Sequence, residues 1–89
     1  MKIGIKIEEV GDVNNEYNYL EVFFEDSVEP FLDIGVSEER KLVFKFYKSN
    51  KEFFLDVEEW EVILDRAKKF LPIALQNADD IKNMKWDKE

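Results

Sequence analysis

The sequence has 89 residues and a formal net charge of −8, with 45% apolar residues and neither cysteine nor histidine. The length suits one small domain, 1-89, and the missing residue types exclude disulfides, thiol chemistry and the commonest general base and metal ligand. No segment approaches the roughly 18 to 20 apolar residues of a membrane span, and no signal peptide opens the chain. We therefore expect a cytoplasmic domain.

The first 55 residues predict an antiparallel sheet of four to five strands. Apolar and polar residues alternate, as in half-buried strands, over 1–10, 19–26, 31–36 and 42–48, and a brief fifth strand is expected over 52–55. The connections are short and contain turn residues. Short connections favour an antiparallel meander, because parallel neighbours need longer crossovers.

The same alternation predicts which side chains face the core and which face outward. The inner face is expected to hold Ile3, Ile5, Ile7, Leu20, Val22, Phe24, Leu32, Ile34, Leu42, Phe44, Phe46 and either Phe53 or Leu55. The outer face is expected to hold Tyr19, Glu21, Phe23, Glu25, Phe31, Asp33, Val43, Lys45, Tyr47 and either Phe53 or Phe54.

A helix is predicted to cover the inner face. Nine apolar residues recur at helical spacing between Asp56 and Leu75: Val57, Trp60, Ile63, Leu64, Ala67, Phe70, Leu71, Ala74 and Leu75. Asp56 and Glu59 form a capping-box pattern at its start. Pro72 lies inside the pattern, so we expect a kink near Phe70–Leu71 or a second helix starting at Pro72. The predicted fold is α+β, with the helix over 56-78 and a polar tail or short helix over 79-89.

The negative charge is concentrated in the N-terminal half of the chain. Eleven acidic residues and no Lys or Arg lie between Glu8 and Glu39, whereas residues 40–89 contain ten acidic and eleven basic residues. Such a field repels nucleic acid and anionic membranes and attracts a basic partner.

The outer face combines aromatic rings with carboxylates, which suits a protein partner. Rings supply buried area and carboxylates pair with Lys or Arg, so the candidate partner-binding residues are Glu21, Phe23, Glu25, Asp33 and Tyr47. The loop acids form an alternative contact set: Glu8, Glu9, Asp12, Glu16, Asp26 and Glu29. The rings are equally compatible with cross-strand packing on a wet sheet and with closure of this face by a homodimer.

No catalytic residue, cofactor or metal site is predicted. Glu21 and Asp33 are expected on neighbouring strands, and paired carboxylates can perform acid–base chemistry, but no pocket signature accompanies them. Asp79, Asp80 and the acids of 58–61 lack the loop spacing and turn glycine of a calcium motif. We interpret these acids as residues of helix ends and solvated faces.

Two family resemblances bear on function. A sheet with exposed rings followed by a helix that begins LDVEEW resembles the single-stranded-DNA-binding coactivators and Whirly proteins in outline. Those proteins bind through basic sheets, whereas the matching strands here carry Glu21, Glu25 and Asp33 against Lys45, so the charge disfavours nucleic acid.

The stretch from Tyr19 to Asp80 resembles, in size, charge and strand–helix layout, the small immunity proteins encoded beside contact-dependent growth inhibition toxins of bacteria. This resemblance implies a cytoplasmic antitoxin that binds and neutralises a cognate, basic nuclease toxin. Opposed charges also accelerate such an encounter. The alternative is a self-associating structural or regulatory domain, whose partner would be a second copy.

Overall fold

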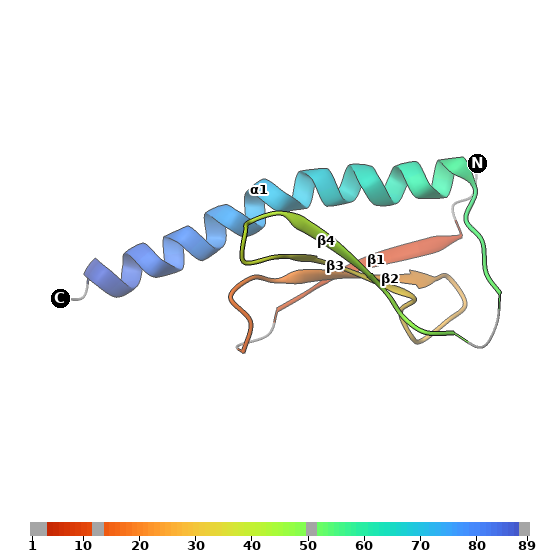
Figure 1. The fold of residues 1–89 in the computed structure, drawn as a ribbon, viewed down its shortest axis with the longest axis horizontal. Coiled ribbons are helices and arrows are strands. Elements are labelled where there is room, and N and C mark those ends of the chain that lie inside the picture. Colours follow the sequence, from red (N-terminus) through yellow and green to blue (C-terminus); the bar gives the residue numbers. More distant parts are fainter. Residues whose placement is uncertain (1–3, 12–13, 50–51, 88–89) are drawn as a thin grey trace.

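The structure is a computed structural model that describes residues 4–11, 14–49 and 52–87, with side chains as far as Ile81. Four strands, β1 (Ile5–Val10), β2 (Tyr19–Phe24), β3 (Leu32–Val36) and β4 (Leu42–Phe46), precede the helix α1 (Val57–Asp87). The sheet order is β1-β2-β3-β4 and each neighbouring pair is antiparallel. The predicted α+β meander with a C-terminal helix on one face is confirmed (Figure 1). The fifth strand is not formed, because 52–55 has no regular secondary structure.

The core lies between α1 and the inner face of the sheet. Its buried cluster combines ten side chains: Ile5, Leu20, Val22, Phe31, Leu32, Ile34, Ile63, Ala67, Phe70 and Ala74. Most of the predicted inner face is therefore correct, although Ile3 lies outside the described residues. Trp60 packs at the margin of the cluster, where its ring centroid is 6.2 Å from that of Phe44, and Leu64 is only half-buried.

Phe31 was expected on the outer face and instead packs into the core. Its ring centroid lies 4.3 Å from that of Phe24, in a stacked arrangement, and 5.3 Å from that of Phe53. Phe31 lies just before β3, and its N–H donates to the carbonyl of Val22, which is paired with Leu32; two successive residues therefore lie against Val22, and the alternation is interrupted there. The three rings fill one end of the core.

Two residues that were expected to face the core are exposed instead, Phe46 and Val57. Phe46 was expected inside but is 52% exposed, and Val57, at the start of the helix, is 73% exposed. Figure 1 shows β4 running away from α1 toward its C-terminal end, so the twisted sheet carries Phe46 out from beneath the helix.

The predicted capping box starts the helix. The Glu59 backbone N–H donates to Asp56 Oδ1 over 2.7 Å, and the Asp56 backbone N–H donates to Glu59 Oε1 over 3.1 Å. This reciprocal pair satisfies two backbone donors that would otherwise lack partners. Local sequence therefore determines where α1 begins.

The helix neither breaks at Pro72 nor ends near residue 78. It is continuous over 31 residues, through Pro72 to Asp87, and its axis bends gently near the middle in Figure 1. Pro72 and Lys68, whose carbonyl would be the helical partner of residue 72, are both exposed, while Phe70 and Ala74 stay buried on either side of the proline. Packing therefore holds the helix together across the proline. No helix of the described residues is both long and apolar enough to cross a membrane.

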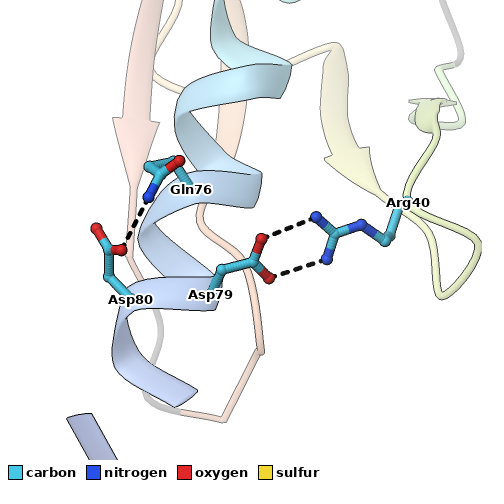
Figure 2. Close-up of polar contacts among 4 residues, drawn as sticks. All are labelled: Arg40, Gln76, Asp79 and Asp80. Atoms are coloured by element: carbon cyan, nitrogen blue, oxygen red, sulfur yellow. Dashed lines mark hydrogen bonds and ion pairs between the residues drawn. The ribbon is translucent and has the colours of Figure 1, made fainter. Parts of the chain in front are cut away.

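One ion pair ties the distal half of α1 to the sheet. The Arg40 guanidinium, in the turn between β3 and β4, donates two hydrogen bonds of 3.0 Å to the Asp79 carboxylate (Figure 2). Arg40 has a φ of 66°, a left-handed conformation that costs a non-glycine residue on the order of 1 kcal/mol. Beyond this contact the helix outruns the sheet, and the molecule measures 52 × 26 × 22 Å.

Candidate functional site

The strand register assembles a row of carboxylates on the outer face. Glu8 lies opposite Glu21, Glu21 lies opposite Asp33, and Asp33 lies opposite Lys45, so four charged residues cross the sheet in series. We call Glu8, Glu21 and Asp33 the acidic row. Its three negative charges stand side by side with one cation at the β4 end.

This arrangement is electrostatically unfavourable. Like charges directly opposite each other destabilise a sheet, and Glu21 has such a neighbour on both sides. The pKa of Glu21 is raised above its ordinary value, first because partial burial disfavours the charged form and then because Asp33 and Glu8 repel it. The row therefore attracts protons and, by the same field, any other cation.

Tyr47 completes the row at Asp33. The Tyr47 hydroxyl donates a hydrogen bond of 2.7 Å to Asp33 Oδ2, and this bond, with partial burial and the charges of Asp33 and Glu21, raises the pKa of Tyr47 to about 12. The Lys45 ammonium lies 5.7 Å from the centre of the Tyr47 ring. Among the described residues, Asp33 Oδ1 is buried without a hydrogen-bond partner. The Asp33 carboxylate is thus only partly satisfied.

Phe23 is on the predicted face but is not accessible. Only 6% of its surface is exposed, and the Lys6 ammonium lies 5.0 Å from the centre of its ring. A ring that is already buried cannot bury further area against a partner. Of the two aromatic residues predicted to anchor a partner, only Tyr47, which is 39% exposed, offers surface.

The structure brings Glu21, Asp33 and Tyr47 together but leaves Glu25 apart. β2 ends at Phe24, so Glu25 is exposed in the following turn, where its backbone N–H donates to the Gly4 carbonyl over 2.9 Å.

The alternative set of loop acids is dispersed over the fold. Glu8 belongs to the acidic row, and Glu9 accepts a hydrogen bond of 3.0 Å from the Asn18 amide. Glu16 is exposed in the loop between β1 and β2, Asp26 and Glu29 are exposed in the turn after β2, and Asp12 lies outside the described residues. This set therefore does not form one contact surface.

An open cleft of about 780 Å³ adjoins the acidic row and was not predicted from the sequence. The loop of residues 14–18 forms one wall, and residues 37–38 of the turn between β3 and β4 also line the cleft. Tyr19, Gly35 and Val43 contribute from three strands, and Asp33 and Lys45 also line the cleft. The cleft is built by segments that are distant in sequence, so the sequence could indicate it only through Gly35, a glycine inside a strand.

A second open hollow of about 520 Å³ lies around Phe24, Phe31, Phe53 and Tyr47. Tyr47 therefore stands between this hollow and the acidic row, since it lines the first and hydrogen-bonds to the second.

The described residues contain no group of three or more Asp or Glu side chains arranged to hold a metal ion. The site offers carboxylate acceptors beside a phenol and an open cleft, which suits cationic and hydrogen-bond-donating groups.

Comparison of the chain with protein-family models, with curated proteins and with solved structures finds no match.

Proposed function

We propose that this protein is a cytoplasmic immunity protein that binds and neutralises a basic toxin, with the acidic row and Tyr47 at the centre of the contact. The observation that carries the proposal is the row itself. Three carboxylates aligned across the sheet cost folding stability, and within the described strands the register places one cation, Lys45, directly opposite a member of the row. A partner that supplies Lys or Arg side chains would turn this cost into binding energy.

The toxin is a nuclease in this proposal, because a nuclease surface that binds phosphates is rich in Lys and Arg. The row would pair with those residues and so occlude the surface that the nuclease needs for its substrate. Glu25, in the turn after β2 and apart from the row, contributes to steering rather than to the contact itself. No cofactor and no catalytic step are part of the proposal.

The competing proposal, a self-associating domain, is disfavoured by the same row. A two-fold dimer apposes the same patch of each copy, so two acidic rows would face each other across the interface. Exposed Val43 and Tyr47 would favour such contact, but the repulsion between carboxylates would oppose it. Nucleic acid is disfavoured for the same reason, because its phosphates would meet the carboxylates.

The test starts from the gene immediately upstream: its product is purified and assayed for nuclease activity with and without this protein, and a product without toxin activity would count against the proposal. We expect inhibition through a one-to-one complex. The double variant Glu21→Gln with Asp33→Asn should slow association by about tenfold at low salt, with a smaller effect at high salt. Glu25→Lys should also slow association without changing the fold.

The matched control is Glu61→Gln, which removes one exposed carboxylate of α1, the helix that covers the opposite face of the sheet. It should leave the association rate unchanged. Absence of inhibition at micromolar concentrations, or inhibition that is insensitive to the double variant, would refute the proposal. A stable dimer of the pure protein by light scattering, disrupted by Val43→Glu, would favour self-association instead.

A further inference from the structure

Gly35 is a glycine for which the fold itself offers no reason. It lies inside β3, opposite Val43 of β4, and its φ is not in the left-handed range. A Cβ added at this position would meet no atom within 4 Å. Glycine inside a strand costs roughly 0.5 to 1 kcal/mol relative to alanine, and it often marks a place where a ligand approaches the backbone closely.

The missing side chain leaves the floor of the 780 Å³ cleft open. Gly35 lines this cleft together with Tyr19 and Val43 on the neighbouring strands, and the wall formed by residues 14–18 includes Tyr17. The Arg40 guanidinium, fixed to Asp79 on α1 (Figure 2), also interacts with the Tyr17 side chain. The Tyr17 side chain of this wall therefore lies close to the Arg40–Asp79 ion pair.

The lining of the cleft favours a cation with a flat, apolar surface. It contains three carboxylates, of Glu16, Asp33 and Glu38, and one ammonium, of Lys45, while the Arg40 guanidinium interacts with the Tyr17 side chain of the lining. Lys45 lies opposite Asp33 and near the Tyr47 ring, so its charge sits at one end of the cleft. Tyrosine rings attract cations over their faces, and a guanidinium also stacks on them and donates to carboxylates in pairs.

We propose that this cleft, with Gly35 as its floor and the Tyr17 and Tyr19 side chains in its lining, receives an arginine side chain of the partner. The inference rests on the proposed function, because the basic toxin would supply that arginine. The acidic row would steer the toxin and pair with its surface charges. The cleft would then bury a single arginine and so fix the orientation of the complex.

A titration with a small probe tests the cleft without the toxin. The probe is N-acetyl-arginine N-methylamide, followed by amide chemical shifts of the isotope-labelled protein. The chain has three glycines, so the Gly35 amide is readily followed. We expect saturable shifts at Gly35 and Val43, and at least about tenfold weaker binding of the citrulline analogue, which has the same shape without the charge.

The variant Gly35→Leu fills the floor of the cleft and should weaken arginine binding by at least about tenfold, the equivalent of 1.4 kcal/mol. Because the added Cβ meets no atom, its thermal unfolding should match or exceed that of the parent. Asn77→Leu, which places the same side chain on an exposed position of α1, is the control and should bind arginine normally. The comparison of arginine with citrulline on the parent protein needs no variant, so it holds even if a variant folds poorly.

Equal binding of arginine and citrulline, shifts confined to residues outside the cleft, or normal binding by folded Gly35→Leu would each overturn the inference. Its failure is distinguishable from failure of the proposed function. If the toxin is inhibited but arginine does not bind at Gly35, the inference about the cleft fails and the proposed neutralisation stands. If arginine binds at Gly35 but the toxin is not inhibited, the inference about the cleft stands and the proposed neutralisation fails.

Discussion

Replacing Glu21 by Gln should stabilise the folded protein and weaken its binding to a basic partner. The substitution keeps the shape of the side chain and removes the middle charge of the acidic row. Two like-charge contacts, with Glu8 and with Asp33, disappear together. Cross-strand pairs contribute roughly 0.2 to 1 kcal/mol each, and solvent screening favours the lower part of that range, so the expected gain is about 0.5 to 1 kcal/mol at neutral pH.

The gain should depend on pH in a defined direction. The pKa of Glu21 is raised in the folded state, so the folded protein binds this proton more tightly than the unfolded chain does. The contribution of Glu21 to stability is therefore fully present below its ordinary pKa of 4.5 and is lost as the pH rises through the raised value. Gln has no such proton, so the advantage of Glu21→Gln should be large at neutral pH and close to zero below pH 4.5.

Urea unfolding followed by circular dichroism measures both quantities. For a domain of this size, a gain of about 1 kcal/mol also raises Tm by roughly 4 to 8 °C. Glu29→Gln, in an exposed turn, is the control and should be neutral within about 0.5 kcal/mol. A variant that is less stable than the parent at neutral pH, or a gain that persists undiminished under acidic conditions, would refute the electrostatic account of the row.

Three further substitutions test the hydrogen bond, the cap and the core. Tyr47→Phe removes the 2.7 Å hydrogen bond to Asp33 and should lower the free energy of unfolding in urea by about 1 to 2 kcal/mol. In the parent protein, an absorbance titration should show one tyrosine, Tyr47, that ionises only near pH 12. Asp56→Ala removes the N-cap of α1 and should lower stability by about 1 kcal/mol, whereas no loss would mean that the capping box is not formed in solution. Phe70→Ala should cost about 3 to 5 kcal/mol, against less than about 0.5 for exposed Ile73→Ala, and similar losses for the two would contradict the orientation of α1.

The sequence by itself determined the features whose causes are local. Strict alternation identified four strands, because successive side chains of a strand point to opposite faces. The Asp56–Glu59 pattern located the helix start, because the two residues satisfy each other's backbone donors within one turn. Short polar connections indicated an antiparallel meander, and that topology is observed.

Local patterns failed where contacts between distant segments outweighed them. Alternation predicted that Phe31 would face outward. The residue lies just outside its strand, and its ring is buried in the core against Phe24 instead. Phe46 follows the alternation but leaves the core because the sheet twists away from α1. Pro72 should interrupt a helix in isolation, yet packing on the sheet on both sides of it keeps the helix continuous.

The candidate site depended most on tertiary structure. The sequence showed that the acids and rings are on one face, but only the register placed Glu21 between Glu8 and Asp33. Phe23 is on that face but is buried, which the alternation of residues along the strand could not predict. The cleft at Gly35 joins a loop, a turn and three strands, so it exists only after folding. Charge and periodicity are properties of the chain, whereas pair repulsion, exposure and concavity depend on which residues become neighbours in space.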